Sequence, residues 1–156
     1  MLELYKPRPE DLWFRQKFLS DPETMSYNNA WGGAVGFPEG EWQDWYDHWI
    51  TNAGDKRFYR YLMNEESEFV GETASHYDSE RKIYMADIIV YAPYRGRGCG
   101  YRSLELLCNK ARENGVEVIY DDIAIDNPAI SLFMKQGFTE QYRTDEIIML
   151  SKRLRE

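Results

Sequence analysis

The sequence predicts one α/β (α+β) domain over residues 1–156, with a mixed central sheet flanked by helices. The N-terminal third carries large apolar residues at helical spacing. The middle of the chain alternates apolar and polar residues as antiparallel strands do. A glycine-rich loop, Arg95–Gly100, then joins a strand to an amphipathic helix. Neither a linker nor a repeat interrupts this order, so we expect a single domain.

The N-terminal half is expected to hold a strand at Leu2–Lys6, a helix at Leu12–Leu19 and a helix at Glu39–Thr51. Pro9 and the two acids after it suit the start of the first helix. The segment Tyr27–Pro38 is predicted to be a loop long enough to have a function. The second helix places four aromatic residues on one side, Trp42, Trp45, Tyr46 and Trp49.

The rest of the chain alternates strands and helices. Strands are predicted at Phe58–Met63, Glu68–His76, Ile83–Val90 and Val116–Ile125, and a final hairpin at Phe138–Arg143 with Glu146–Leu150. Helices are predicted at Ser103–Ala111 and Ala129–Gln136. Asn114 and Gly115 supply the C-cap of the longer helix.

Composition restricts the class of protein. The chain is 43% hydrophobic, which excludes a disordered tail. Its net charge of −8 argues against nucleic-acid binding and favours cationic partners. The sequence starts without a hydrophobic signal core and has no run that would span a bilayer, so we expect a cytoplasmic protein without a membrane partner. A homodimer is left open.

The loop Arg95–Gly100 has the character of an anion cradle, because glycines admit a ligand close to the backbone and the first helical turn offers unpaired N–H groups. A P-loop is excluded because Tyr101 and Arg102, rather than Lys and Ser or Thr, follow Gly100. The glycine spacing also fails the dinucleotide fingerprint. The pattern that fits is Arg-x-x-Gly-x-Gly, and the ligand that we expect it to bind is a pyrophosphate.

This pattern, together with the downstream segment Ile123–Phe138, resembles the GNAT superfamily of N-acetyltransferases. The downstream segment has the strand, Asn127, helix and Gly-Phe ending of that family. The resemblance implies a GNAT-type fold whose two central strands splay apart to admit the arm of acetyl-CoA. It implies that acetyl-CoA contacts Ile88, Val90, Arg95, Gly96, Arg97, Gly98, Cys99, Gly100, Tyr101, Asn127 and Phe133.

The implied activity is that of an acyltransferase, moving an acetyl group from acetyl-CoA to a primary amine by direct attack in a ternary complex. The acceptor would be a small cationic amine or a peptide amine. The resemblance places the oxyanion donors on the backbone near Val90. One departure is Phe133, which stands where many family members have a Tyr that protonates the thiolate. Water, Tyr101 or Tyr120 is then a candidate acid, and a non-catalytic acyl-CoA-binding module is the alternative function.

Three acids are candidates for the general base that an ammonium acceptor requires. Asp121 and Asp122 are adjacent in an otherwise apolar strand, so they point to opposite faces. Asp122 lies five positions before Asn127, where some family members carry an acidic base. Asp87 is the reserve candidate. The alternative for the adjacent pair is a structural ion pair with an Arg or Lys of a neighbouring element.

For the acceptor, we expect contacts from Asn28, Asn29 and Trp31 in the long N-terminal loop. The aromatic side of the second helix is expected to belong to the core.

His48 and His76 lack carboxylates at metal-ligand spacing, so no metal site is expected. Cys99 and Cys108 form no CxxC pair, and we interpret them as structural rather than catalytic.

Overall fold

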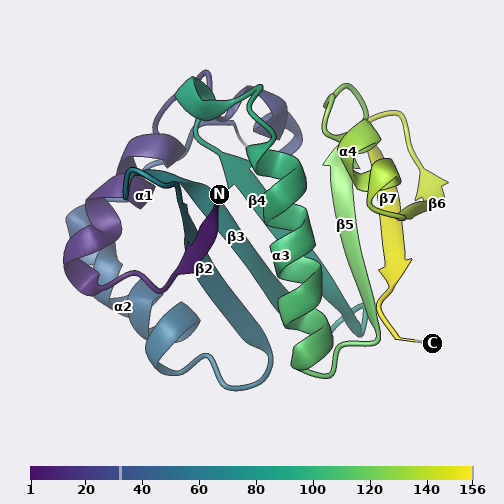
Figure 1. Ribbon diagram of the computed structural model, residues 1–156, viewed down its shortest axis with the longest axis horizontal. Helices are drawn as coiled ribbons and strands as arrows, with labels where there is room; N and C mark the ends of the chain where they lie inside the picture. The colour runs from purple at the N-terminus through teal and green to yellow at the C-terminus, as the bar shows by residue number, and fades with distance from the viewer. Residues whose placement is uncertain (32, 156) are drawn as a thin grey trace.

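Seven strands form one mixed sheet in the order β1-β2-β3-β4-β5-β7-β6, as the computed structural model shows (Figure 1). The structure describes residues 1–31 and 33–155, without the side chains of residues 29–31. The strands are β1 (Glu3–Tyr5), β2 (Arg57–Met63), β3 (Phe69–Asp78), β4 (Ile83–Val90), β5 (Val118–Ala124), β6 (Thr139–Arg143) and β7 (Ile147–Arg153). The predicted mixed sheet is confirmed.

Four α-helices flank the sheet: α1 (Leu12–Leu19), α2 (Trp42–Tyr46), α3 (Cys99–Glu113) and α4 (Ile130–Lys135). Short 3-10 turns precede α1 and α2, at Pro9–Asp11 and Glu39–Glu41, and a π-helical turn, Asp47–Thr51, continues α2. The predicted helix over 39–51 is therefore three consecutive helical segments of different pitch. No helix in the described residues is long and apolar enough to cross a bilayer.

The pair β4 and β5 runs parallel and is joined over only two positions, Tyr84 with Ile119 and Met85 with Tyr120. Every other neighbouring pair in the sheet is antiparallel and has a longer ladder. Both strands continue past the joined positions, so their C-terminal halves separate. The splayed central strands expected from the family resemblance are present.

Each face of the sheet has its own core. On one face α3 packs over β3 and β4, and its residues Leu104 and Leu107 share a buried cluster with Ile119 of β5 and Phe133 of α4. On the other face α1 and the aromatic side of α2 pack on Tyr59 and Tyr61 of β2. In Figure 1, α3 crosses the near side of the sheet while α1 and α2 lie at its β1 edge. The separation of β4 and β5 therefore opens between these two layers.

Three segments differ from their predicted bounds. α3 begins at Cys99 rather than at position 103, because Gly98 adopts a left-handed φ of 81° and serves as the N-cap. β7 extends to Arg153 because it pairs with β5 along its whole length, Val118 facing Arg153. Part of the predicted loop over 27–38 is a 3-10 helix, Ser26–Trp31.

Gly71 allows β3 to approach β4 closely beside the splay. A Cβ on Gly71 would lie 2.3 Å from the carbonyl oxygen of Ile89 and 3.1 Å from Cα of Val90. Both contacts are with backbone, which has little freedom to move away in the middle of a sheet. A side chain at this position would push β4 away from β3 just where the strand leaves β5.

We predict that Gly71→Ala destabilises the fold by about 1–3 kcal/mol, the usual range for overpacking a core. Urea unfolding measures the free energy, and Gly40→Ala is the matched control because no atom lies within 4 Å of its added Cβ. Equal stability of the two variants would mean that the close approach of β3 and β4 imposes no constraint.

Candidate active site

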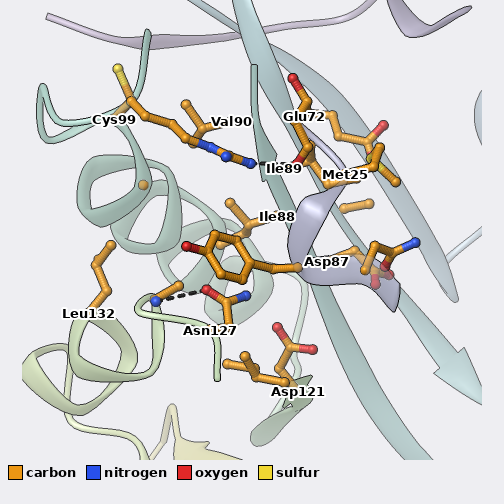
Figure 2. A pocket seen from close by; sticks show the side chains of 18 of the residues that line it. Met25, Glu72, Asp87, Ile88, Ile89, Val90, Cys99, Asp121, Asn127 and Leu132 are labelled. Atoms are coloured by element: carbon orange, nitrogen blue, oxygen red, sulfur yellow. Dashed lines mark hydrogen bonds between the residues drawn. The ribbon is translucent and has the colours of Figure 1, made fainter. Parts of the chain in front are cut away.

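A cleft of about 710 Å³ opens where β4 and β5 separate. It runs from the first turn of α3 to the aromatic side of α2, and Figure 2 shows side chains from both strands around it. Residues 87–90 of β4 form one wall and residues 121–124 of β5 form the other. The cleft therefore joins the two faces of the sheet.

The α3 end of the cleft is a row of unpaired main-chain donors. The N–H groups of residues 96–101 donate to no acceptor in the described part of the chain. Gly96 and Gly98 have φ values of 77° and 81°, which turn the backbone tightly before the helix. Six successive donors at the positive end of a 15-residue helix form a site for a phosphate or pyrophosphate. The predicted anion cradle thus has the required donors.

Arg95 is engaged differently from the way the sequence implies. Its guanidinium donates to the main-chain carbonyls of Glu23 (3.1 Å) and Thr24, and lies 5.8 Å from the ring centroid of Tyr27. Arg95 therefore fastens the glycine loop to the segment after α1. The side chain still borders the cleft, but its guanidinium is already hydrogen-bonded, whereas the main-chain N–H groups of residues 96–101 have no acceptor in the described chain.

Most of the other expected cofactor contacts come together here. Ile88, Val90, Gly96, Gly98, Cys99, Gly100, Asn127 and Phe133 line the cleft. Arg97 and Tyr101 are outside its lining: Arg97 lies over the ring of Tyr94 at 5.6 Å, and Tyr101 is exposed. Tyr120 is also absent from the lining. Neither of the two tyrosines considered as the acid therefore borders the cleft beside Phe133.

Three residues of the α3 and α4 side have clear structural roles. The side-chain oxygen of Asn127 accepts the N–H of Ala129 at 2.9 Å, which fixes the turn into α4 (Figure 2). Phe133 packs edge-on against Phe138 with ring centroids 5.0 Å apart. Burial raises the pKa of the Cys99 thiol, so the helix end does not make it a thiolate. This agrees with a structural role for Cys99.

The two adjacent acids of β5 point to opposite faces, as predicted. Asp121 faces Leu150 of β7 in the register, on the side of the α3 core, and Asp122 faces Met149. Asp87 and Asp122 each lie two residues beyond the joined pair Met85 and Tyr120. Their side chains therefore share one face of the sheet, on either side of the splay.

These carboxylates have different environments. Asp122 is partly exposed and lies 3.6 Å from Arg81, the ion pair foreseen as the alternative for this position. Asp121 is buried without a cationic partner in the described residues, and burial, with Asp87 and Asp122 nearby, raises its pKa well above the ordinary value. Asp121 therefore lies on the α3 side of the cleft with a raised pKa, and Asp122 lies on the opposite side.

A buried group around Glu72 of β3 borders the same cleft and was missed by the sequence analysis. Glu72 accepts the hydroxyl of Tyr59 at 2.5 Å and lies 3.4 Å from Nε of Arg15. The Arg15 guanidinium is held 4.4 Å from the ring centroid of Trp45 and 4.7 Å from that of Phe37. Burial raises the pKa of Glu72, and Arg15 opposes the rise.

His76 supports Asp87 from the neighbouring strand. Its Nδ1 lies 3.5 Å from the Asp87 carboxylate, and this interaction raises the pKa of His76. The imidazole also packs edge-on against Trp49, with centroids 5.8 Å apart. Asp87 is therefore flanked by a half-buried imidazole on the neighbouring strand.

The expected acceptor loop is only partly described. Asn28 borders the cleft and donates its amide to the carbonyl of Gly33 at 3.3 Å. The side chains of Asn29 and Trp31 lie outside the described part of the structure. Trp45 and Trp49 pack on the α1 core, as expected for the aromatic side, and they also line the cleft. No three metal-ligating side chains come together among the described residues.

Comparison with known proteins identifies the fold family. The model of the acetyltransferase (GNAT) family matches residues 11–138. The chain belongs to the GNAT family. No match was found among curated proteins.

Solved structures agree with this GNAT assignment. An N-acetyltransferase from Staphylococcus aureus Mu50 is 18% identical, with a TM-score of 0.79, and the match covers 99% of each chain. A spermidine N-acetyltransferase from Vibrio cholerae, in complex with CoA and spermine, is 17% identical over 98% of this chain and 95% of that one, with a TM-score of 0.77. A phosphinothricin acetyltransferase from Sinorhizobium meliloti, in complex with AcCoA, is 16% identical over 97% and 88%, with a TM-score of 0.77. At these identities the likeness establishes the fold.

The raised pKa of Asp121 predicts how the stability of this GNAT domain varies with pH. The folded state holds the proton more tightly than the unfolded state, so the contribution of Asp121 to stability is complete below its ordinary pKa of 3.8. It is lost as the pH rises towards the folded-state pKa. Asn keeps the side chain neutral at every pH.

We therefore predict that the Tm of Asp121→Asn rises relative to the parent as the pH increases above the ordinary pKa of 3.8, because only the parent then loses the contribution of the protonated carboxyl. Calorimetric melting at a series of pH values above 3.8 checks it. Asp126→Asn, which removes one exposed carboxylate beside the same strand, controls for the change in net charge. If both variants follow the same pH dependence, Asp121 is not a buried neutral acid.

Proposed function

We propose that this chain is an N-acetyltransferase that moves the acetyl group of acetyl-CoA to a primary amine. The acceptor is a small cationic amine or a peptide amine, and it attacks directly in a ternary complex. The observation that supports the proposal best is that the two ends of one cleft differ in chemistry. Its α3 end offers unpaired N–H donors for phosphate, and its other end holds the carboxylates Glu72, Asp87 and Asp122.

The cofactor would bind along the separation of β4 and β5. Its pyrophosphate would accept hydrogen bonds from the N–H groups of residues 96–101, which have no protein acceptor in the described chain. The acyl arm would pass between the two strands, beside Ile88 and Val90. A Cβ on Gly100 would lie 3.0 Å from Leu132, so the absence of a side chain there keeps this passage open. These residues fit acetyl-CoA in shape and charge.

The acceptor half of the cleft suits an ammonium group. Both guanidinium groups that border the cleft are engaged, Arg15 beside Glu72 and Arg95 at main-chain carbonyls, while Asp87 is half-exposed. Trp45 and Trp49 add aromatic faces that attract cations. The chain's charge of −8 would attract a cationic acceptor from a distance. Solved neighbours that act on spermidine and on phosphinothricin support an amine acceptor.

An ammonium acceptor loses two protons on its way to the amide, one before the attack and one from the tetrahedral intermediate. One proton reaches the departing thiolate, and the other is released to solvent. An amine of pKa about 10.4 needs roughly 4–5 kcal/mol to lose its proton at pH 7. Asp87 and Asp122 stand on the acceptor face at either side of the splay, so they are the bases that we propose. The freed nitrogen attacks the thioester carbon, and the C–S bond then breaks as the amide forms.

Asp121 is our proposed acid for the departing thiolate. It faces the cofactor half of the cleft, is buried, and has a raised pKa, so it carries a proton to give. Phe133, in the same half, has no hydroxyl for this step. A thiol of pKa about 8.5 is a fair leaving group at neutral pH, so this assistance would be worth only about 2 kcal/mol.

The proposal is tested by measuring thiol release from acetyl-CoA with a panel of amines that includes spermidine, a lysine-containing peptide and a neutral amine. We expect release above background hydrolysis with at least one cationic amine, and an acetylated product by mass spectrometry. Binding of acetyl-CoA in calorimetry without turnover on any amine would favour the alternative, a non-catalytic acyl-CoA-binding module.

We predict that Gly98→Ala weakens acetyl-CoA binding by at least about tenfold, because the new Cβ and the altered turn disturb the cradle. Calorimetry measures the dissociation constant. Gly115→Ala is the matched control: its φ is 89°, close to the 81° of Gly98, and both positions have open space around the added Cβ. Equal affinities in the two variants would contradict the cradle assignment.

We also predict that Asp122→Asn and Asp87→Asn each lower kcat by about 10²–10⁴, the usual contribution of a general base. Acetyl-CoA affinity should stay within about twofold of the parent, because neither side chain holds the cofactor. Higher pH should restore part of the rate, since more of the amine is then already neutral. Asp126→Asn is the control, and parent-like kcat in both test variants would remove these acids from the mechanism.

A further inference from the structure

A second cavity, of about 440 Å³, lies at the opposite end of α3 from the glycine loop. Its walls are the first residues of β2, the segment 53–56 and the C-terminal turns of α3, which is the lower end of this helix in Figure 1. Trp49 is the single described residue that borders both this cavity and the cleft. The cavity is therefore separate from the proposed acetyl-transfer site.

Cations dominate the lining of this second cavity. It holds five basic side chains and one acidic side chain: Lys6, Lys56, Arg57, Arg60, Lys110 and Asp55. The chain as a whole has the opposite bias, with 27 acids and 19 bases. Among the described residues, none of these five cations has a carboxylate within 4.0 Å. Lys6 and Lys56 are exposed and screened by water, whereas Arg57, Arg60 and Lys110 are partly buried, so their mutual repulsion is screened less and an anion bound there would relieve it.

Among these five cations, Arg60 gives the strongest indication of a missing anion. Its guanidinium lies 4.6 Å from the ring centroid of Phe58 and donates to the carbonyl of Tyr59 at 2.7 Å. It is half-buried, and this burial lowers its pKa. A half-buried charge that has a carbonyl and an aromatic ring but no carboxylate beside it is only partly compensated, and an anion in the cavity would neutralise it.

Helix ends explain part of the basic cluster but not all of it. Arg57 donates to the carbonyls of His48 (2.7 Å) and Asn52 (3.0 Å), so it caps the π-helical turn after α2. The C-terminal end of α3 lies beside Lys110. Two helix ends together amount to about one negative charge, and Asp55 adds one more. Three of the five cations remain without compensation.

We propose that this second cavity is a binding site for a small phosphate-bearing polyanion. Lys6, Arg60 and Lys110 would neutralise the phosphates, since Lys and Arg side chains are the usual phosphate partners in proteins. Tyr84 and Trp49 border the same cavity and offer aromatic surface. The ligand is therefore an inorganic polyphosphate or a nucleoside polyphosphate, and it binds away from acetyl-CoA.

The test is calorimetric titration of the full chain with tripolyphosphate and with ATP at low salt, each in the absence and presence of saturating CoA. We expect binding that persists with CoA bound. ATP binding more tightly than tripolyphosphate would identify a nucleoside polyphosphate, and equal affinities would identify recognition of the phosphates alone.

Two double variants with the same change in charge decide the location of the site. Lys6→Gln with Lys110→Gln should weaken tripolyphosphate binding by at least tenfold, and the exposed pair Lys82→Gln with Lys135→Gln should leave it within twofold. Thermal melting confirms that both variants fold. The comparison is made at saturating CoA, which occupies the glycine loop. Equal affinity in the two double variants, complete loss of tripolyphosphate binding when CoA is saturating, or no binding by the parent would each overturn the proposal.

Discussion

The brief pairing of β4 with β5 is the constraint on which the rest of the structure depends. Two parallel strands that are joined at only two positions must separate, and the main-chain groups beyond those positions need other partners. The separation produces the cleft, brings the start of α3 to its rim, and leaves Asp87 and Asp122 on the same face of the sheet, one on each side of the gap. Gly71 supports the separation from the β3 side of β4. Because it has no side chain, β3 can stay close to β4 at the point where β4 parts from β5.

The sheet then sorts charge between its two faces. Because successive side chains on β5 alternate, neighbouring acids enter different environments: Asp121 is buried with a raised pKa on the α3 side, and Asp122 is paired with Arg81 on the opposite side. A single strand thus supplies a proton donor and a proton acceptor for the proposed reaction. The same division separates the end of the cleft that is rich in main-chain N–H donors from its carboxylate-lined end, so each proposed substrate would meet the opposite charge.

Sequence reasoning located the elements that local patterns determine. The glycine loop, the alternating strands and the opposed directions of Asp121 and Asp122 follow from backbone geometry over a few residues. The group around Glu72 could not be predicted this way, because it joins Arg15 of α1 to Tyr59 and Glu72 of neighbouring strands through burial alone. Arg95 was assigned to the cofactor by its place in the motif, whereas its hydrogen bonds to Glu23 and Thr24 depend on the path of a distant segment. The splay itself was expected only from the family resemblance, since periodicity does not show where two strands part.

The most direct measurement of the central claim is an NMR titration of the ¹⁵N-labelled chain with acetyl-CoA, following the amide resonances. If the splay and the α3 cradle bind the cofactor, the largest shifts will fall on residues 96–101, with a second group at residues 88–90 of β4. The amides around Lys110, at the far end of α3, should change little. Shifts that avoid residues 96–101 at saturating acetyl-CoA would contradict the account.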